Sequence, residues 1–92
     1  MQNTIAEEKL KRYFDITKKA FEKAKKAPSD RISERKEILD MVANYVSDAD
    51  HFYKKGDFVN AFAALSYAHG WLDAGARLGV YKVTDSKLFT VD

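Results

Sequence analysis

The chain contains no cysteine, and this absence excludes disulfide bridges, thiolate metal sites and cysteine nucleophiles. A chain without cysteine is suited to a reducing compartment, so we expect a cytoplasmic protein. Proline is almost absent as well, because Pro28 is the only one, and there are only four glycines. These few strong breakers mark the places where helices are expected to end.

Long hydrophobic runs are also missing. The most apolar segment, residues 58–72, is too short and too interrupted to span a bilayer, and residues 1–8 lack the apolar core of a signal peptide. We therefore expect no association with a membrane. The 92 residues, of which 46% are hydrophobic, are enough for one core, so the sequence predicts a single domain over residues 1–92.

Neither charge sign is in large excess, because the formal net charge is only +2. The two parts of the chain nevertheless differ. Residues 1–36 contain 11 Lys and Arg against 6 Asp and Glu, whereas residues 37–92 contain 5 against 8. Such an asymmetry can attract an acidic partner to the N-terminal part, or it can let the chain complement itself on folding or dimerising. Composition leaves both options open.

What the sequence does contain is helical periodicity. Apolar residues recur at three- and four-residue spacing in three segments, which predicts helices over about residues 5–26, 30–55 and 58–78. Helices of similar length joined by short connections favour an antiparallel up-and-down three-helix bundle. Residues 80–92 have no helical stripe and are expected to form a short extended tail. The predicted fold class is therefore all-α.

Residues that start or stop helices stand near the predicted boundaries. Thr4 opens a capping box for the first helix, and Ser29 and Asp30 are suited to cap the second. Gly56 and Gly79 are suited to the left-handed turns that end the second and third helices. Asp57 follows Gly56 directly and is expected to cap the third helix. The turn at Gly56 and Asp57 therefore predicts a helical hairpin.

Small residues on the third predicted helix indicate that this hairpin is tightly packed. The expected packing seam consists of Ala61, Leu65, Ala68, Leu72 and Gly75. Because alanine and glycine let two helices approach closely, the seam accounts for these residues as core without assigning them a function.

One candidate chemistry is a metal site between the second and third helices. Folding the hairpin about its turn brings Asn44 level with His69, and Asp40 level with Asp73. A histidine and carboxylates on facing helices can hold a metal ion, which would indicate a metal-dependent enzyme. However, the chain has no Glu-x-x-His motif and only one imidazole takes part. We favour a hydrogen-bonded His69 at the edge of the bundle, with no metal and no cofactor.

A second alternative is a nucleic-acid-associated accessory protein that uses the lysine-rich first helix. Half of the cations in that helix have an acidic residue four positions earlier, which favours ion pairs within the helix. The cations without such a partner include Lys9, Lys18, Lys23 and Lys25. No glycine-rich phosphate loop accompanies them, so a charge-balanced solvated surface is the better interpretation.

The best candidate for function is an aromatic face on the third helix. Tyr67 and Trp71 lie four residues apart, offset from the packing seam, and His69 and Asp73 are close in the sequence. Large rings with one polar atom are typical of protein contact surfaces. We therefore name Tyr67, His69, Trp71 and Asp73 as protein-contact candidates. The alternative is that the first helix or the tail covers this face.

The turn and the helix after it also resemble a known family. The Gly-Asp-Phe turn at 56–58 and the alanine-rich helix over 61–74, with Ser-Tyr-Ala-His-Gly at 66–70, are similar to the small archaeal proteins known as domain of unknown function 357. The resemblance covers nearly the whole chain. It implies a compact three-helix bundle from an archaeon, and it brings no established activity.

Together these observations favour a non-enzymatic helical module that acts through protein contacts. The partner is not specified by the sequence, and a homodimer is one form that such contacts can take. Nucleic-acid binding and metal-dependent catalysis stay as the two alternatives.

Overall fold

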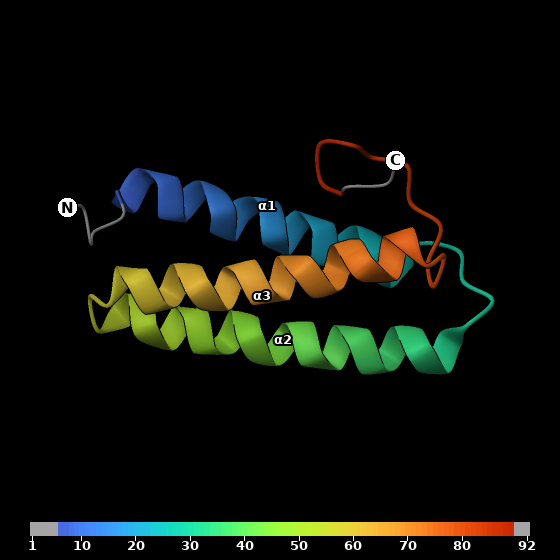
Figure 1. Cartoon of the computed structure of the whole chain (residues 1–92), viewed down its shortest axis with the longest axis horizontal. Coiled ribbons are helices and arrows are strands. Elements are labelled where there is room, and N and C mark those ends of the chain that lie inside the picture. Colours follow the sequence, from blue (N-terminus) through green and yellow to red (C-terminus); the bar gives the residue numbers. More distant parts are fainter. Residues whose placement is uncertain (1–5, 90–92) are drawn as a thin grey trace.

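The computed structural model describes residues 6–89 and consists of three α-helices followed by a tail. They are α1 (Glu7–Lys26), α2 (Ile32–Lys54) and α3 (Phe58–Arg77). Successive helices run antiparallel, and α3 lies between α1 and α2 (Figure 1). α3 packs closely on α2 and less closely on α1, whereas α1 and α2 touch only sparsely. The predicted all-α three-helix bundle is confirmed.

Two glycines end helices as the sequence predicts. Gly56 has φ 77° and Gly79 has φ 72°, the left-handed conformation that a residue with Cβ rarely adopts. In both turns the N–H of the glycine and the N–H of the next residue bond to carbonyls in the last turn of the helix. Asp57 then caps α3, because its carboxylate accepts a hydrogen bond from the backbone N–H of Asn60.

The start of α2 differs from the prediction. α2 begins at Ile32, and neither Ser29 nor Asp30 caps it. The Ser29 hydroxyl instead donates a hydrogen bond to the carbonyl of Val80 in the tail, at 2.5 Å, and accepts one from the Arg31 N–H. Tertiary contact with the tail has thus replaced a local cap. For α1, the predicted cap Thr4 lies outside the described residues.

The core is divided into two clusters along the bundle. The turn-end cluster, near the α2–α3 turn, consists of Leu10, Phe14, Ala49, Ala61, Ala64 and Leu65. The tail-end cluster, at the opposite end, consists of Ala20, Ala24, Leu39, Val42, Ala68, Leu72, Val80, Tyr81 and Phe89. The alanines of α2 and α3 at the centre of these clusters explain why these two helices approach so closely. None of the three helices combines the length and the apolar content that crossing a membrane requires.

The tail folds back on the bundle and completes the core. Tyr81 is fully buried, and its hydroxyl donates a hydrogen bond of 2.6 Å to the carbonyl of Leu72. Its ring occupies the space above Gly75, where a Cβ would lie 2.5 Å from the ring carbon Cζ. Burial, and secondarily the charge of Asp73, raise the pKa of Tyr81 above its usual range. Gly75 is therefore needed for the close approach of this ring.

Candidate functional site

The side of α3 that faces away from the core carries almost no charge. Its exposed residues, called the exposed face of α3 below, are Val59, Asn60, Ala63, Ser66, Tyr67, Gly70, Trp71, Ala74 and Arg77. Arg77 is the only charged member. By comparison, Tyr13 is the only uncharged residue among the exposed positions of α1. The contrast matters because a helix face with no binding role is normally covered with charged residues.

Large apolar side chains on this face are open to solvent. The exposed fraction is 63% for Tyr67, 52% for Val59 and 41% for Trp71, and Leu78 just after the helix reaches 70%. Neither α1 nor the tail as far as residue 89 covers Tyr67 and Trp71, so the aromatic face is exposed and the alternative of a covered face is not observed. A continuous apolar surface of this kind is typical of a binding site.

On the α2 side, Tyr67 has a stacking partner and Trp71 borders a hollow. The Tyr67 ring stacks on Tyr45, with ring centroids 5.5 Å apart and planes inclined by 19°. A hollow of about 390 Å³ is lined by Trp71 and by residues of α2: Glu37, Ile38, Asp40, Met41 and Asn44. A ring that is already positioned, as Tyr67 is by Tyr45, loses little conformational entropy when a partner binds.

His69 and Asp73 lie on a different side of α3. Two residues correspond to about 200° around a helix, so His69 points away from Tyr67. His69 Nε2 is 3.6 Å from Asp73 Oδ1, and both side chains are 26% exposed. The other ring nitrogen, Nδ1, is buried and has no hydrogen-bond partner among the described residues. These two predicted contact residues are therefore not part of the exposed face of α3.

The structure does not form the metal site considered from the sequence. Asp40 and Asn44 line the hollow beside Trp71, whereas His69 and Asp73 lie on the other flank of α3. Within residues 6–89, no three His, Cys, Asp or Glu side chains come together in a way that could hold a metal ion. This alternative therefore gains no support, because residues at the same level along two helices need not point toward each other.

The sequence that forms this bundle matches a known protein family. The model of the family described as protein of unknown function (DUF357) matches residues 12–81. The chain belongs to the DUF357 family. No curated protein and no solved structure matches the chain. Membership confirms the resemblance seen in the turn and in α3, and it assigns no activity, so the function of this DUF357 protein has to be argued from its surfaces.

Two of the lysines considered for nucleic-acid contact have partners within this DUF357 bundle. The Lys9 ammonium lies over the ring of Phe62, 5.7 Å from its centroid. Lys18 Nζ is 4.0 Å from a carboxylate oxygen of Asp50 on α2 and 5.2 Å from the centroid of Phe14. Neither lysine has an acidic residue four positions earlier, but both have partners on other helices, namely Phe62 on α3 and Asp50 on α2.

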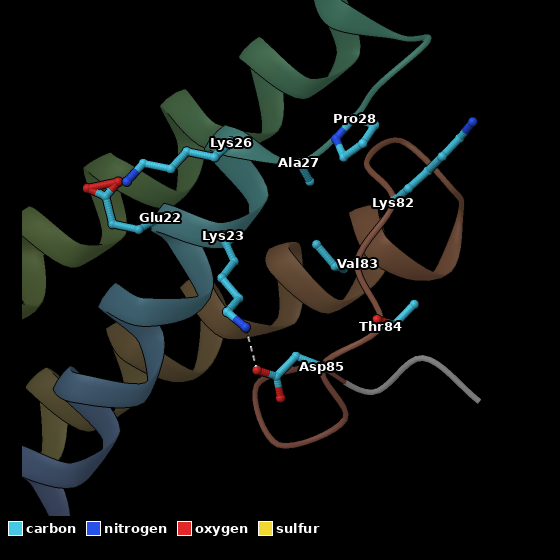
Figure 2. A pocket seen from close by; sticks show the side chains of 9 residues that line it. All are labelled: Glu22, Lys23, Lys26, Ala27, Pro28, Lys82, Val83, Thr84 and Asp85. Carbon is cyan, nitrogen blue, oxygen red and sulfur yellow. Dashed lines mark hydrogen bonds and ion pairs between the residues drawn. The ribbon is translucent and has the colours of Figure 1, made fainter.

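A third lysine is tied to the tail. Lys23 Nζ donates a hydrogen bond of 2.8 Å to Asp85 across a hollow of about 400 Å³ between the last turn of α1 and the tail (Figure 2). Lys82, on the rim of the same hollow, pairs with Asp30 at 3.3 Å. Two of the cations around the hollow are thus partly neutralised by the chain itself. Only Lys25, of the four named lysines, has no partner among the described residues.

The Lys23–Asp85 contact ties the tail to α1, and we expect acid to weaken it. The hydrogen bond from Lys23, with a further one from the Lys87 backbone N–H, lowers the pKa of Asp85 below its ordinary 3.8. A lowered pKa in the folded state contributes stability above the unfolded-state pKa, and this contribution is lost as the pH falls through the folded-state value. We expect Lys23→Met to flatten the fall in melting temperature between about pH 5 and about pH 2.

The matched control for this pH series is Lys25→Met, which removes a lysine of the same helix without a described partner. Thermal unfolding followed by circular dichroism at each pH measures the effect. Equal pH profiles for Lys23→Met and Lys25→Met would show that Asp85 gains nothing from Lys23.

Sequence reasoning found the two aromatic residues and missed most of the surface around them. Val59, Ala63, Ala74 and Leu78 were not singled out, and Gly70 was noted only as part of the Ser-Tyr-Ala-His-Gly segment. The signal was present, because charged residues are absent at successive three- and four-residue steps along the outer side of α3. It was hidden because small residues on a helix indicate internal packing as readily as an exposed binding face.

Proposed function

We propose that this DUF357 protein is a helical module that acts through protein contacts, rather than by catalysis, and that the exposed face of α3 is its contact surface. One observation carries the proposal: the outer side of α3 exposes large apolar side chains along its whole length and has only one charged residue, Arg77. Monomeric surfaces rarely expose so continuous an apolar area unless it binds something.

The composition of the face supports this interpretation. Tyr67 and Trp71 belong to the residue types that contribute most to binding energy at protein interfaces. Gly70 lies between them, Ala63 and Ala74 lie on either side, and these small residues leave room for another backbone to approach. The partner is either a second copy of the chain or a different protein, and the two cases are separated by light scattering of the purified protein at high micromolar concentration.

Site-specific photo-crosslinking in extract of the source cells tests the proposal. A photoreactive residue at Ala74 is expected to give a small number of discrete protein cross-links. The same residue at Lys25, an exposed α1 position, is the matched control and is expected to give few. Tyr67→Lys in the Ala74-labelled protein should reduce the yield at least tenfold, because it puts a charge in the centre of the contact.

Two results would contradict the proposal. One is an equal pattern of cross-links from positions 74 and 25, which would indicate non-specific encounters. The other is a yield from position 74 that Tyr67→Lys leaves unchanged while circular dichroism shows a folded protein. Cross-links to nucleic acid from position 25 alone would support the nucleic-acid alternative instead.

A further inference from the structure

The exposed face of α3 continues into a groove beside α2. Trp71 forms one wall of the hollow described above, and Ile38 and Met41 supply apolar surface on the α2 side. Toward the α2–α3 turn, the stacked rings of Tyr45 and Tyr67 extend this apolar surface. We call the groove lined by these five residues the α2/α3 groove. It is open to solvent, since Met41, Tyr67 and Trp71 are all at least 40% exposed.

Negative charge borders the α2/α3 groove on its α2 side. Glu37 and Asp40 line the hollow, and Asp48 lies seven residues after Met41 on the same side of the helix. We call these three residues the acidic edge of α2. Asp40 accepts a hydrogen bond of 2.8 Å from Lys36, whereas Glu37 and Asp48 have no partner among the described residues.

We infer that the α2/α3 groove binds a basic amphipathic helix of a partner protein, an inference that rests on the proposed function. A helix laid beside α3 would place its apolar side chains on Tyr67 and Trp71, with one large side chain in the hollow. Gly70 and Ala74 allow its backbone to come close. Its Lys and Arg residues would then face Glu37 and Asp48, whose charges are not neutralised within the described part of the chain.

The same charges argue against a second copy as the occupant. A symmetric dimer through this surface would bring together two identical faces, each with the acidic edge of α2 and with Arg77 as its only α3 cation. The lysine-rich surface of α1 offers cations but almost no exposed apolar residue beside them. Neither surface of a second copy therefore combines apolar and basic side chains in the way that the groove requires.

Trp71 is the only tryptophan in the chain and serves as the reporter of binding. The probe is a synthetic helical peptide of leucine and lysine with one apolar side, compared with the same peptide carrying glutamate in place of lysine. We expect the lysine peptide to shift the Trp71 emission to shorter wavelength in a saturable titration. Its Kd should be at least tenfold lower than that of the glutamate peptide and should rise with salt.

Charge-removing variants locate the site. Replacing Glu37→Gln together with Asp48→Asn should raise the Kd of the lysine peptide at least fivefold. The control is Glu8→Gln together with Asp15→Asn on α1, which makes the same change in net charge away from the groove and should leave the Kd within twofold. Both pairs are exposed, so the melting temperature is expected to stay close to that of the unmodified protein.

Equal affinity for the two peptides would overturn the inference, because the attraction would then be apolar only. An equal loss of affinity in the two variant pairs would also overturn it, because the attraction would then be spread over the whole charged surface. These results leave the proposed function separately testable. Cross-links from position 74 that depend on Tyr67, combined with a failed Trp71 titration, reject the basic helix while retaining a protein contact. If neither the Tyr67-dependent cross-links nor the Trp71 titration is observed, the basic helix and the protein contact are both rejected.

Discussion

Replacing Tyr81 by alanine is expected to lower the free energy of unfolding by about 3–5 kcal/mol, the usual cost of removing a buried aromatic side chain. The effect is large because Tyr81 is fully buried and packs against Phe89, so its loss also releases the rest of the tail. Tyr81→Phe keeps the ring and removes only the hydrogen bond to Leu72, so about 0.5–1.5 kcal/mol is expected. Urea denaturation followed by circular dichroism measures both.

Gly75→Ala provides a stricter test of the same contact, because its effect should change sign with the residue at position 81. In the unmodified protein the new Cβ would meet the Tyr81 ring, and the displaced ring should cost about 1–3 kcal/mol. In the Tyr81→Ala protein that clash is absent, and alanine should stabilise α3 by up to about 1 kcal/mol relative to glycine. Destabilisation of similar size in both proteins would show that the ring does not rest on Gly75.

Leu65→Ala is expected to destabilise the other end of the bundle by about 2–5 kcal/mol. Leu65 is 1% exposed and lies in the turn-end cluster, where neighbouring alanines cannot move far enough to fill the cavity left behind. The matched control is Leu78→Ala, the same change at a residue that is 70% exposed, for which a change within about 0.5 kcal/mol is expected. Chemical denaturation of both variants at low protein concentration measures the difference.

A Leu65→Ala protein as stable as Leu78→Ala would contradict the packing of the turn-end cluster. A drop in the denaturant slope together with the midpoint would indicate a different event, namely that the two clusters no longer unfold as one unit. Because the clusters share α1, α2 and α3 as common walls, we expect a single transition.

The architecture was predictable from local signals. Gly56, Asp57 and Gly79 act through their own backbone and side-chain geometry, and the structure shows each in the expected role. The start of α2 was not predictable in the same way. Ser29 has a hydroxyl that can cap a helix, but its hydrogen bond goes to Val80, 51 residues later. Local propensity gives way where a distant segment offers a competing partner.

The candidate surface was predictable only in part, for a related reason. The spacing of Tyr67 and Trp71 placed both rings on one side of α3, but their exposure depends on where α1 and the tail dock. Helical periodicity says nothing about that docking. The alternative of a metal site illustrates a second limit of the sequence. The level of Asn44 and His69 along the hairpin could be counted, whereas their directions around the helix axes depend on how α2 and α3 pack.

The burial of the tail has a consequence for where the folding unit begins and ends. The family match spans residues 12–81, yet Leu10 lies in the turn-end cluster and Phe89 in the tail-end cluster, both almost completely buried. A polypeptide trimmed to the matched segment would lose one core side chain from each cluster and would place a terminal carboxylate on Tyr81, beside the most buried ring of the domain. The segment that folds is therefore longer than the segment by which the family is recognised, and expression of the domain should extend at least from residue 10 to residue 89.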